Sequence, residues 1–176
     1  MPRSFAPVVG RSPRVLILGS MPGEASLRAR RYYAHPYNQF WRLLGGALGE
    51  DLQGMPYRGR LSALKKRGVA LWDVLEFCRR EGSLDSNITR AKPNPIVELV
   101  GRGGIEAIFL NGGKAAALFR RFHAPHLPRG VRVAALPSSS PAAASISLAR
   151  KAASWRRVGR ALDARHPQLI QKVKRP

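Results

Sequence analysis

Four short apolar segments, separated by stretches with helical character, most restrict how this chain can fold. They lie at residues 14–19, 68–75, 105–112 and 131–141, and each leads into a loop rich in Gly, Ser, Asn or Pro. Runs of this length and composition are typical of strands that are buried on both faces.

Helical patterns lie between these strands, at residues 38–50, 59–67, 95–103 and 113–122, and a last one follows them at 145–166. We read residues 80–95 as a loop because they are rich in Gly, Ser, Asn and Pro. Strands that alternate with helices predict the α/β class. We expect a three-layer α/β/α sandwich around a central four-stranded parallel sheet, with right-handed crossovers.

The carboxyl ends of parallel strands lie at the same edge of a sheet, and ligands of open α/β folds bind there. The loops 20–38, 73–94, 111–114 and 137–145 should therefore meet at one edge. With 176 residues, the chain is expected to form a single domain over 1–176, with flexible ends at 1–12 and 167–176.

Charge is the second strong constraint. The chain has 31 Lys and Arg against 10 Asp and Glu, for a net charge of +21, and nine of the basic residues lie between 150 and 176. A polyanion such as DNA is the natural partner. An arginine-rich proteome is the alternative, and membrane-surface binding is a lesser one because no helix has a clean basic and apolar split.

The cysteine content and the lack of long apolar runs indicate the compartment. Cys78 is the single cysteine, which excludes an internal disulfide and a cysteine-built zinc or iron–sulfur site. The scattered histidines lack metal-ligand spacing, so we expect no metal. The chain has no apolar run long enough to span a bilayer and no secretory h-region at its start. We expect a cytoplasmic, bacterial-type protein that associates with the nucleoid and not with a membrane.

The loops carry an ordered set of motifs: GSMPG (19–23), YYAHPYNQFW (32–41), ALWDVL (70–75), GSLDSNI (82–88), FLNGGKA (109–115) and LPSSSPAAAS (136–145). In this order the set resembles the uracil-DNA glycosylase superfamily, and most of all its family 6 branch, the hypoxanthine- (deoxyinosine-) DNA glycosylases. The resemblance covers about residues 14–156. It implies that the nucleotide is flipped out and its N-glycosidic bond hydrolysed without a cofactor.

The resemblance implies two catalytic residues, Asn38 and His35. Many relatives carry Asn or Asp where this chain has Met21, which cannot orient a water molecule, so the HPxN asparagine, Asn38, is expected to hold it. The alternative for Asn38 is a helix N-cap, and both roles can coexist if its NH2 stays free. His35 either donates to the departing base or only packs the loop.

The base-binding residues that the resemblance implies are Gly19, Ser20, Met21, Gly23, Tyr33, Phe40, Asp73 and Asn111. Gly23 stands where uracil-specific relatives have a Tyr that blocks larger bases. Asp73 stands where they have the Asn that reads uracil. The alternatives are core packing for the aromatics, backbone N–H bonds for Asp73, and a tie between loops for Asn111.

The DNA-backbone residues that the resemblance implies are Lys114, Pro137, Ser138, Ser139 and Ser140. Small hydroxyls and backbone N–H groups suit phosphate contacts. The alternatives are a solvated surface lysine and a plain loop that caps the next helix. The tip of the serine loop has no large side chain that would penetrate the duplex, so penetration is either shallow or comes from elsewhere in the chain.

The sequence thus predicts a monofunctional DNA glycosylase of base excision repair that acts as a monomer on damaged duplex or single-stranded DNA. Its expected substrate is hypoxanthine, with uracil as the second. A glycosylase specific for G:U or G:T mismatches is the first alternative, because Gly23 leaves space for a methyl group. A non-catalytic nucleic-acid-binding protein is the second.

Overall fold

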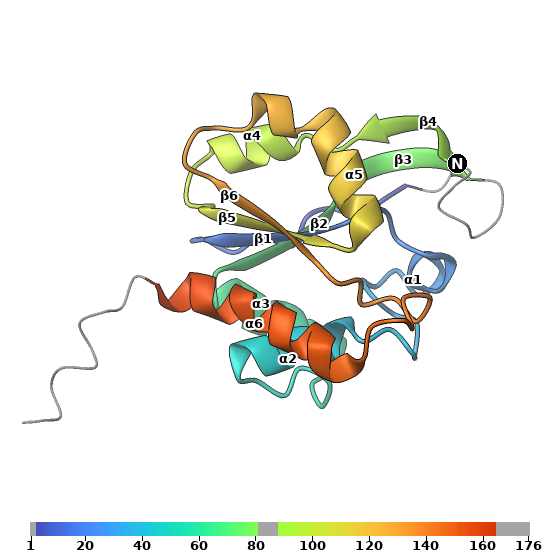
Figure 1. Cartoon of the computed structure of the whole chain (residues 1–176), viewed down its shortest axis with the longest axis vertical. Helices are drawn as coiled ribbons and strands as arrows, with labels where there is room; N and C mark the ends of the chain where they lie inside the picture. The colour runs from blue at the N-terminus through green and yellow to red at the C-terminus, as the bar shows by residue number, and fades with distance from the viewer. Residues whose placement is uncertain (1–2, 81–87, 165–176) are drawn as a thin grey trace, which may run out of the picture.

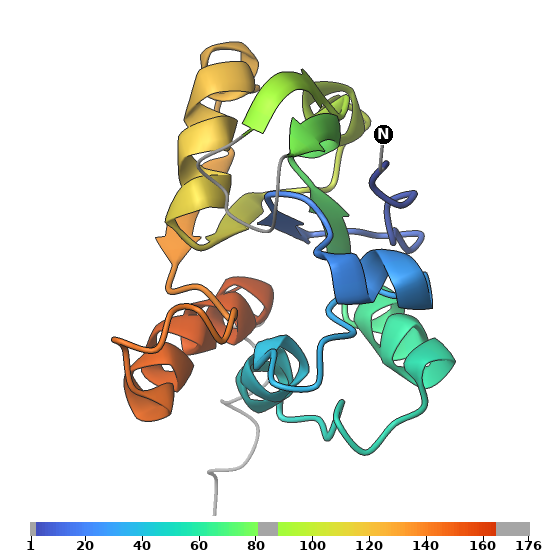
Figure 2. The ribbon, with the colours of Figure 1, turned by 90° about the vertical axis from the view of Figure 1, so that its right-hand side faces the viewer.

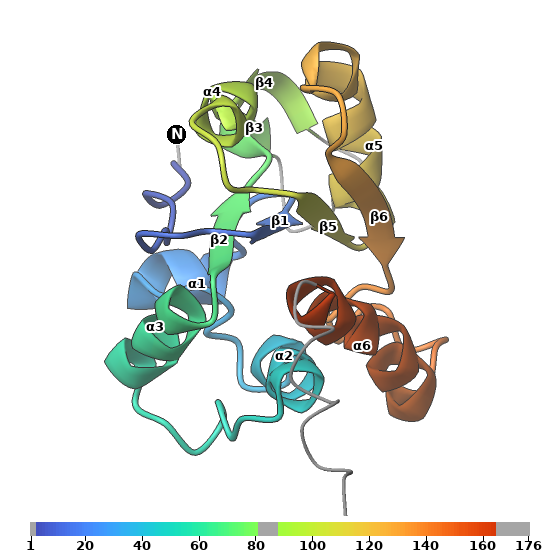
Figure 3. The same ribbon diagram turned by 90° about the vertical axis from the view of Figure 1, so that its left-hand side faces the viewer.

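Four parallel strands form the centre of the molecule. The computed structural model describes residues 3–80 and 88–164. The strands β1 (Val15–Gly19), β2 (Val69–Asp73), β5 (Ala107–Asn111) and β6 (Arg132–Leu136) pair in the order β2-β1-β5-β6. This confirms the predicted four-stranded parallel sheet (Figures 1 and 3).

Helices cover both faces of this sheet. The helices α2 (Phe40–Leu48), α3 (Tyr57–Lys66) and α6 (Leu148–Asp163) lie on one face, and α4 (Ile96–Gly101) and α5 (Gly113–Phe122) lie on the other (Figure 3). A short 3₁₀ turn, η2 (Ala124–His126), follows α5. The predicted three-layer α/β/α sandwich is confirmed, because each layer buries its apolar side against the sheet.

Strand β1 shows why the apolar runs are continuous. Val15 and Ile17 pack under α2 and α6, whereas Leu16 and Leu18 pack under α4 and α5. Alternate side chains of a strand point to opposite faces. A central strand covered on both sides therefore needs an apolar residue at every position, which is the pattern that residues 14–19 carry.

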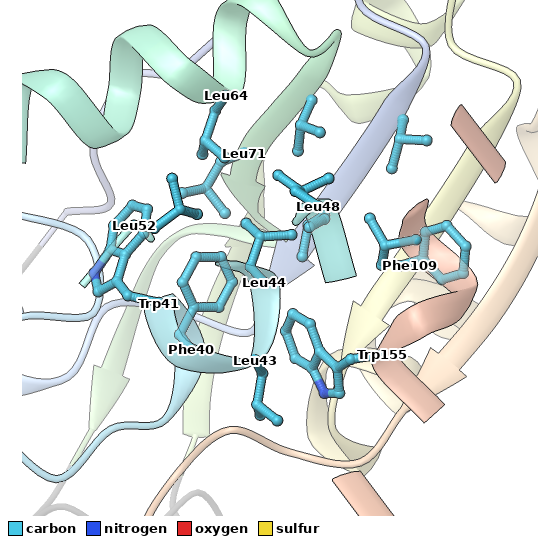
Figure 4. Packing of buried hydrophobic residues seen from close by; sticks show 14 of the residues in the cluster. Phe40, Trp41, Leu43, Leu44, Leu48, Leu52, Leu64, Leu71, Phe109 and Trp155 are labelled. Carbon is cyan, nitrogen blue, oxygen red and sulfur yellow. The ribbon is translucent and has the colours of Figure 1, made fainter. Parts of the chain in front are cut away.

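The larger core lies between the sheet and α2 with α6 (Figure 4). Phe40 and Trp155 are completely buried, and their rings meet edge to face with centroids 5.6 Å apart. The two helices approach closely because Gly159 has no side chain: a Cβ there would collide with the carbonyl oxygen of Ala47. Aromatic pairs of this geometry and this burial fix the position of α2, which begins beside the site described below.

Two features differ from the sequence prediction. A short helix, α1 (Glu24–Ala29), lies within the segment we read as a loop. Residues 75–95 also hold two strands, β3 (Leu75–Arg80) and β4 (Ile88–Pro93), which pair antiparallel in a second sheet. The reading of 80–95 as a loop was therefore wrong at Arg80, which ends β3, and over Ile88–Pro93, which form β4. Of that segment, residues 81–87 lie outside the described residues.

The segment before β1 runs along the sheet. We call residues 3–9 the N-terminal arm. Val8 exchanges backbone hydrogen bonds with Leu71 at 2.8 and 2.9 Å, and the Ser4 N–H donates to the Glu76 carbonyl at 2.7 Å. The Trp72 indole N–H donates to the Phe5 carbonyl at 2.9 Å. The arm is thus packed on the outer strand, whereas flexibility of residues 1–12 stays a prediction.

Candidate active site

Three of the predicted loops, 20–38, 111–114 and 137–145, meet at one edge of the sheet and surround a cavity of about 730 Å³, to which the predicted loop 73–94 contributes Asp73. Its walls come from residues 19–28 and 32–38, from Asp73, from 111–114 and from 138–143. These segments lie on the right of Figure 1, the side that faces the viewer in Figure 2. The chain moves from β1 outward to β2 and then crosses to β5 on the other side of β1. The cavity therefore lies where strand order reverses, the usual ligand position in such sheets.

Tyr33 forms the aromatic wall of the cavity. Its ring is stacked on Phe40, with centroids 3.7 Å apart and planes 8° from parallel. Phe40 is completely buried beneath Tyr33 and Trp155 and does not line the cavity. The prediction of a direct Phe40–base contact is therefore wrong for this geometry, because the face of Phe40 is already covered. Core packing, the alternative, describes Phe40.

The backbone holds Tyr33 in an uncommon conformation. Its φ of 52° lies in the left-handed region of the backbone map, which residues other than Gly and Asn rarely adopt. Bonds on either side secure the turn: the Tyr32 N–H donates to Tyr57 Oη at 2.9 Å, and the Ala34 N–H donates to Ser26 Oγ at 3.2 Å. Strain of this kind persists only where the surroundings enforce it, and such residues cluster at ligand sites.

Asn38 bonds to the start of α2 and lines the cavity, although the N-cap position itself is held by Gln39, so the N-cap alternative was one residue too early. Its Oδ1 accepts the Phe40 N–H at 3.0 Å at the start of α2, and the residue also lines the cavity. Within residues 3–80 and 88–164, its Nδ2 has no hydrogen-bond partner. One lone pair of Oδ1 and the NH2 group therefore remain for a water or a ligand.

His35 lies beside Asn38 on the cavity wall. Its Nδ1 accepts the N–H of Tyr37 at 3.2 Å. In the neutral ring this bond places the proton on Nε2, so that Nε2–H is the remaining donor. The imidazole is exposed, which keeps this donor accessible from the cavity mouth.

Asp73 ends β2 and lines the cavity, although only 3% of its surface is exposed. Its Oδ2 accepts a hydrogen bond from Ser4 Oγ at 2.8 Å. Burial raises the pKa of the Asp73 carboxyl to about 7, and hydrogen bonds from the hydroxyls of Ser4 and Tyr32 oppose that rise. The carboxyl can thus exchange a proton near neutral pH. Among the described residues it accepts no backbone N–H, which was the structural alternative for Asp73.

Gly19 brings Asp73 and Tyr33 together. A Cβ on Gly19 would lie 2.6 Å from Asp73 Oδ1 and 3.0 Å from the Tyr33 hydroxyl. Glycine is therefore required for this close approach. Ser20, Met21 and Gly23 continue the same wall, and nothing lies within 4 Å of the position of a Gly23 Cβ. The cavity is open where Gly23 stands.

Asn111 connects the walls of the cavity. Its Nδ2 donates to the Tyr33 hydroxyl at 3.1 Å and to Ser139 Oγ at 2.9 Å, and its Oδ1 accepts the Ser139 N–H at 2.9 Å. Both amide protons are thus used within the protein. This arrangement fits the alternative interpretation of Asn111, in which its side chain connects two loops, although Asn111 also lines the cavity.

The serine loop has an inner and an outer side. Ser139 is completely buried, and its carbonyl accepts the N–H of Gln39. Ser139 also lines the cavity, but its hydroxyl and its N–H are both bonded to Asn111, and its contact with DNA stays a prediction. The Pro137 carbonyl accepts the Trp155 indole N–H at 3.0 Å, and Pro137 does not line the cavity. Ser138, Ser140 and Lys114 do line it and remain candidates for DNA contacts.

The fold, the order of the loops and the residues at the cavity agree with one family. The sequence matches the family described as the uracil DNA glycosylase superfamily over residues 7–159. The chain belongs to this superfamily. The match includes all four strands of the central sheet and every cavity-lining segment.

Two relatives and one solved structure are similar to this chain, over 64% to 92% of its length. A hypoxanthine DNA glycosylase of Methanosarcina acetivorans is 39% identical over 162 residues, which are 90% of this chain and 98% of that protein. A hypoxanthine DNA glycosylase of Methanosarcina barkeri is 42% identical over 114 residues, or 64% of this chain and 72% of that protein. A solution NMR structure from M. acetivorans, provisionally assigned as a uracil DNA glycosylase, aligns with a TM-score of 0.77, 38% identity and coverage of 92% and 98%.

Sequence reasoning missed two residues near the cavity. Arg28 lies on α1 and lines the cavity, but the short helix that places it was not predicted. Tyr37 is 76% exposed and follows His35, whose ring lies 5.8 Å from its own. A large aromatic between Pro36 and Asn38, in the position that varies within the HPxN pattern, was the available signal for Tyr37.

Metal-binding clusters and membrane spans are both absent from the described residues. Over 3–80 and 88–164, no group of three or more His, Cys, Asp or Glu is arranged to hold a metal ion. In the same ranges no helix has the length and hydropathy needed to cross a membrane.

Proposed function

We propose that this protein removes hypoxanthine from DNA by hydrolysing the N-glycosidic bond of deoxyinosine. The observation that carries the proposal is that one cavity holds the Asn38 amide, the Tyr33 ring and the Asp73 carboxyl. Membership of the superfamily and relatives named hypoxanthine DNA glycosylase support the same reaction.

The reaction starts when the damaged nucleotide leaves the helix and its base enters the cavity. Tyr33, supported by Phe40, offers a flat surface for the base, and stacking of this kind is worth roughly 1 to 3 kcal/mol. The bond between C1′ and the base then breaks, and the bonding electrons leave with the base. The sugar becomes an oxocarbenium-like cation.

Asn38 holds the water that ends the reaction. The NH2 group and the free lone pair of Oδ1 bind the water, whose oxygen attaches to C1′ while its proton passes to the departed base. An amide is a weak base, but attack on a cation needs little base assistance. The Nε2–H of His35 donates to the base as it acquires negative charge.

Asp73 reads the base. As a carboxylate it accepts the lactam N–H that hypoxanthine and uracil both carry. The open space at Gly23 admits the larger purine. Uracil is therefore the second expected substrate, and the same space is the reason to include thymine in G:T pairs in any substrate test.

The DNA backbone contacts the rim of the cavity. Arg28, Lys114, Ser138 and Ser140 line this rim and supply positive charge and hydroxyl groups for phosphates. Tyr37, the most exposed large apolar side chain among the described residues, is the aromatic group that fills the stack when the nucleotide leaves. Its position beside His35 supplies the wedge that the serine loop lacks. The monomeric state stays a prediction.

The test is a panel of end-labelled oligonucleotides that contain hypoxanthine, uracil, xanthine or mismatched thymine. Alkali cleaves the abasic site that each excision leaves. We expect the highest kcat/KM for hypoxanthine. Cleavage of G:T substrates alone would indicate the mismatch-specific alternative. DNA binding without any alkali-labile product would refute the enzyme and leave a nucleic-acid-binding protein.

A further inference from the structure

The N-terminal arm reaches the base pocket from outside the loops that the motifs define. Ser4 Oγ donates to Asp73 Oδ2 at 2.8 Å, and the two residues are 69 positions apart in the sequence. The opposite oxygen, Oδ1, lies against Gly19, because a Cβ on that glycine would come within 2.6 Å of it. One carboxyl oxygen is thus held by the arm, and the other lies at the β1 wall of the cavity.

We propose that Ser4 is a positioning residue for base recognition, which holds the Asp73 carboxyl in the orientation and the ionised form that accept the lactam N–H of the base. This inference rests on the proposed function, because it assigns Asp73 to the base. The hydroxyl of Ser4 is a donor toward the carboxylate, so it favours the charged acceptor over the neutral acid.

The arm is fixed independently of the Ser4 hydroxyl. The Ser4 N–H bonds to Glu76, the Phe5 carbonyl accepts from Trp72, and Val8 pairs with Leu71. A Ser4→Ala variant therefore keeps the backbone path of the arm and loses only the hydroxyl. This makes the role of the hydroxyl separable from the role of the arm in folding.

Few titratable groups influence the ionisation of Asp73. In the described part of the chain, the titratable side chains that interact with it are the phenols of Tyr32 and Tyr33. Burial raises the pKa of both phenols, so they stay neutral and act as hydrogen-bonding groups. Burial also raises the Asp73 pKa to about 7, a range where loss of one donor changes the charge at working pH.

Carboxyl titration by ¹³C NMR tests the contact without any use of activity. The Asp73 signal is assigned by its disappearance in Asp73→Asn. In Ser4→Ala we expect the Asp73 pKa to rise by about one unit, as for loss of one hydrogen bond to a charged acceptor. Ser4→Thr keeps a hydroxyl and should restore the wild-type titration. Ser12→Ala, an exposed serine just beyond the arm, is the matched control.

The pH dependence of kcat/KM for hypoxanthine tests the role in recognition, since this parameter reports groups of the free enzyme. We expect an acidic limb that moves to higher pH in Ser4→Ala and returns in Ser4→Thr. If Asp73 titrates with the same pKa in the wild type and in Ser4→Ala, the proposal is overturned, even if excision is normal. A moved titration with an unmoved limb would overturn the recognition role. If the wild-type protein excises no base, the proposed function is refuted. The NMR titration would still report whether the Ser4 hydroxyl lowers the pKa of Asp73.

Discussion

Replacement of Asn38 by alanine tests the proposed catalytic role against the structural one, because the two roles predict losses of different size. The variant loses the acceptor for the Phe40 N–H, a 3.0 Å bond at the start of α2. Loss of such a capping bond costs about 1 kcal/mol, which lowers the melting temperature of a domain of this size by about 2 to 4 °C. Domains of this kind are stable by several times that amount, so the variant stays folded.

The effect on excision should be much larger. Without the NH2 group and the second lone pair of Oδ1, the water is no longer placed beside C1′. Removal of one positioned catalytic group typically costs about 10² to 10³ in rate, or about 2.7 to 4 kcal/mol of transition-state stabilisation. We therefore expect the loss of transition-state stabilisation, calculated from kcat, to be about three times the loss of folding free energy.

The assay is single-turnover excision of hypoxanthine from a duplex at saturating protein, together with a thermal melt and a DNA-binding measurement. Asn38→Asp is the matched variant, because its carboxylate still accepts the Phe40 N–H but has no NH2. It should melt like the wild type, so that any change in excision reports on the exchange of the amide for a carboxylate and not on the start of α2. An Asn38→Ala protein that cleaves at nearly the wild-type rate and merely melts lower would refute the catalytic role and leave only the structural one.

Four further predictions concern the base and the DNA. Asp73→Asn supplies both an acceptor and a donor, so the uracil-to-hypoxanthine ratio of kcat/KM should rise by about tenfold, the worth of one hydrogen bond; an unchanged ratio would return Asp73 to a structural role. Because the Asp73 pKa is raised to about 7 in the folded state, wild-type stability should fall as pH rises from about 4 to 7, and thermal melts of Asp73→Asn should lack that slope. Affinity for undamaged duplex should fall steeply with salt, given a net charge of +21, and a flat log–log plot would exclude phosphate neutralisation as its source. Tyr37→Ala should weaken excision from duplex more than from single strands, and equal losses in gel assays of the two substrates would exclude a wedge.

The sequence alone determined the layered architecture and the edge at which the site lies. Continuous apolar runs such as Val15–Gly19 fit only strands that are covered on both faces, and alternation with helices makes those strands parallel. The convergence of the loops follows from that topology. The C-terminal end of α2 was also readable, because its apolar stripe is followed by Gly49, which adopts a φ of 69° and ends the helix.

Short elements escaped the sequence because tertiary contacts maintain them. Helix α1 has six residues, and its N-cap, Gly23, offers no side-chain bond, so local propensity is too weak to indicate it. Strands β3 and β4 pair with each other beyond the central sheet, in a segment whose composition suggests a loop. The arm has no periodic pattern, and its bonds to Leu71 and Trp72 are long-range.

Within the site, the sequence identified residue types and the fold decided which of them face the cavity. Tyr33 and Phe40 are both aromatic, and only the left-handed backbone at Tyr33 places one ring over the other. The three successive serines of the loop are chemically identical. All three line the cavity, and Asn111 engages both the hydroxyl and the N–H of Ser139 in hydrogen bonds. Such choices depend on partners that are distant in the chain, which no local pattern of residues can specify.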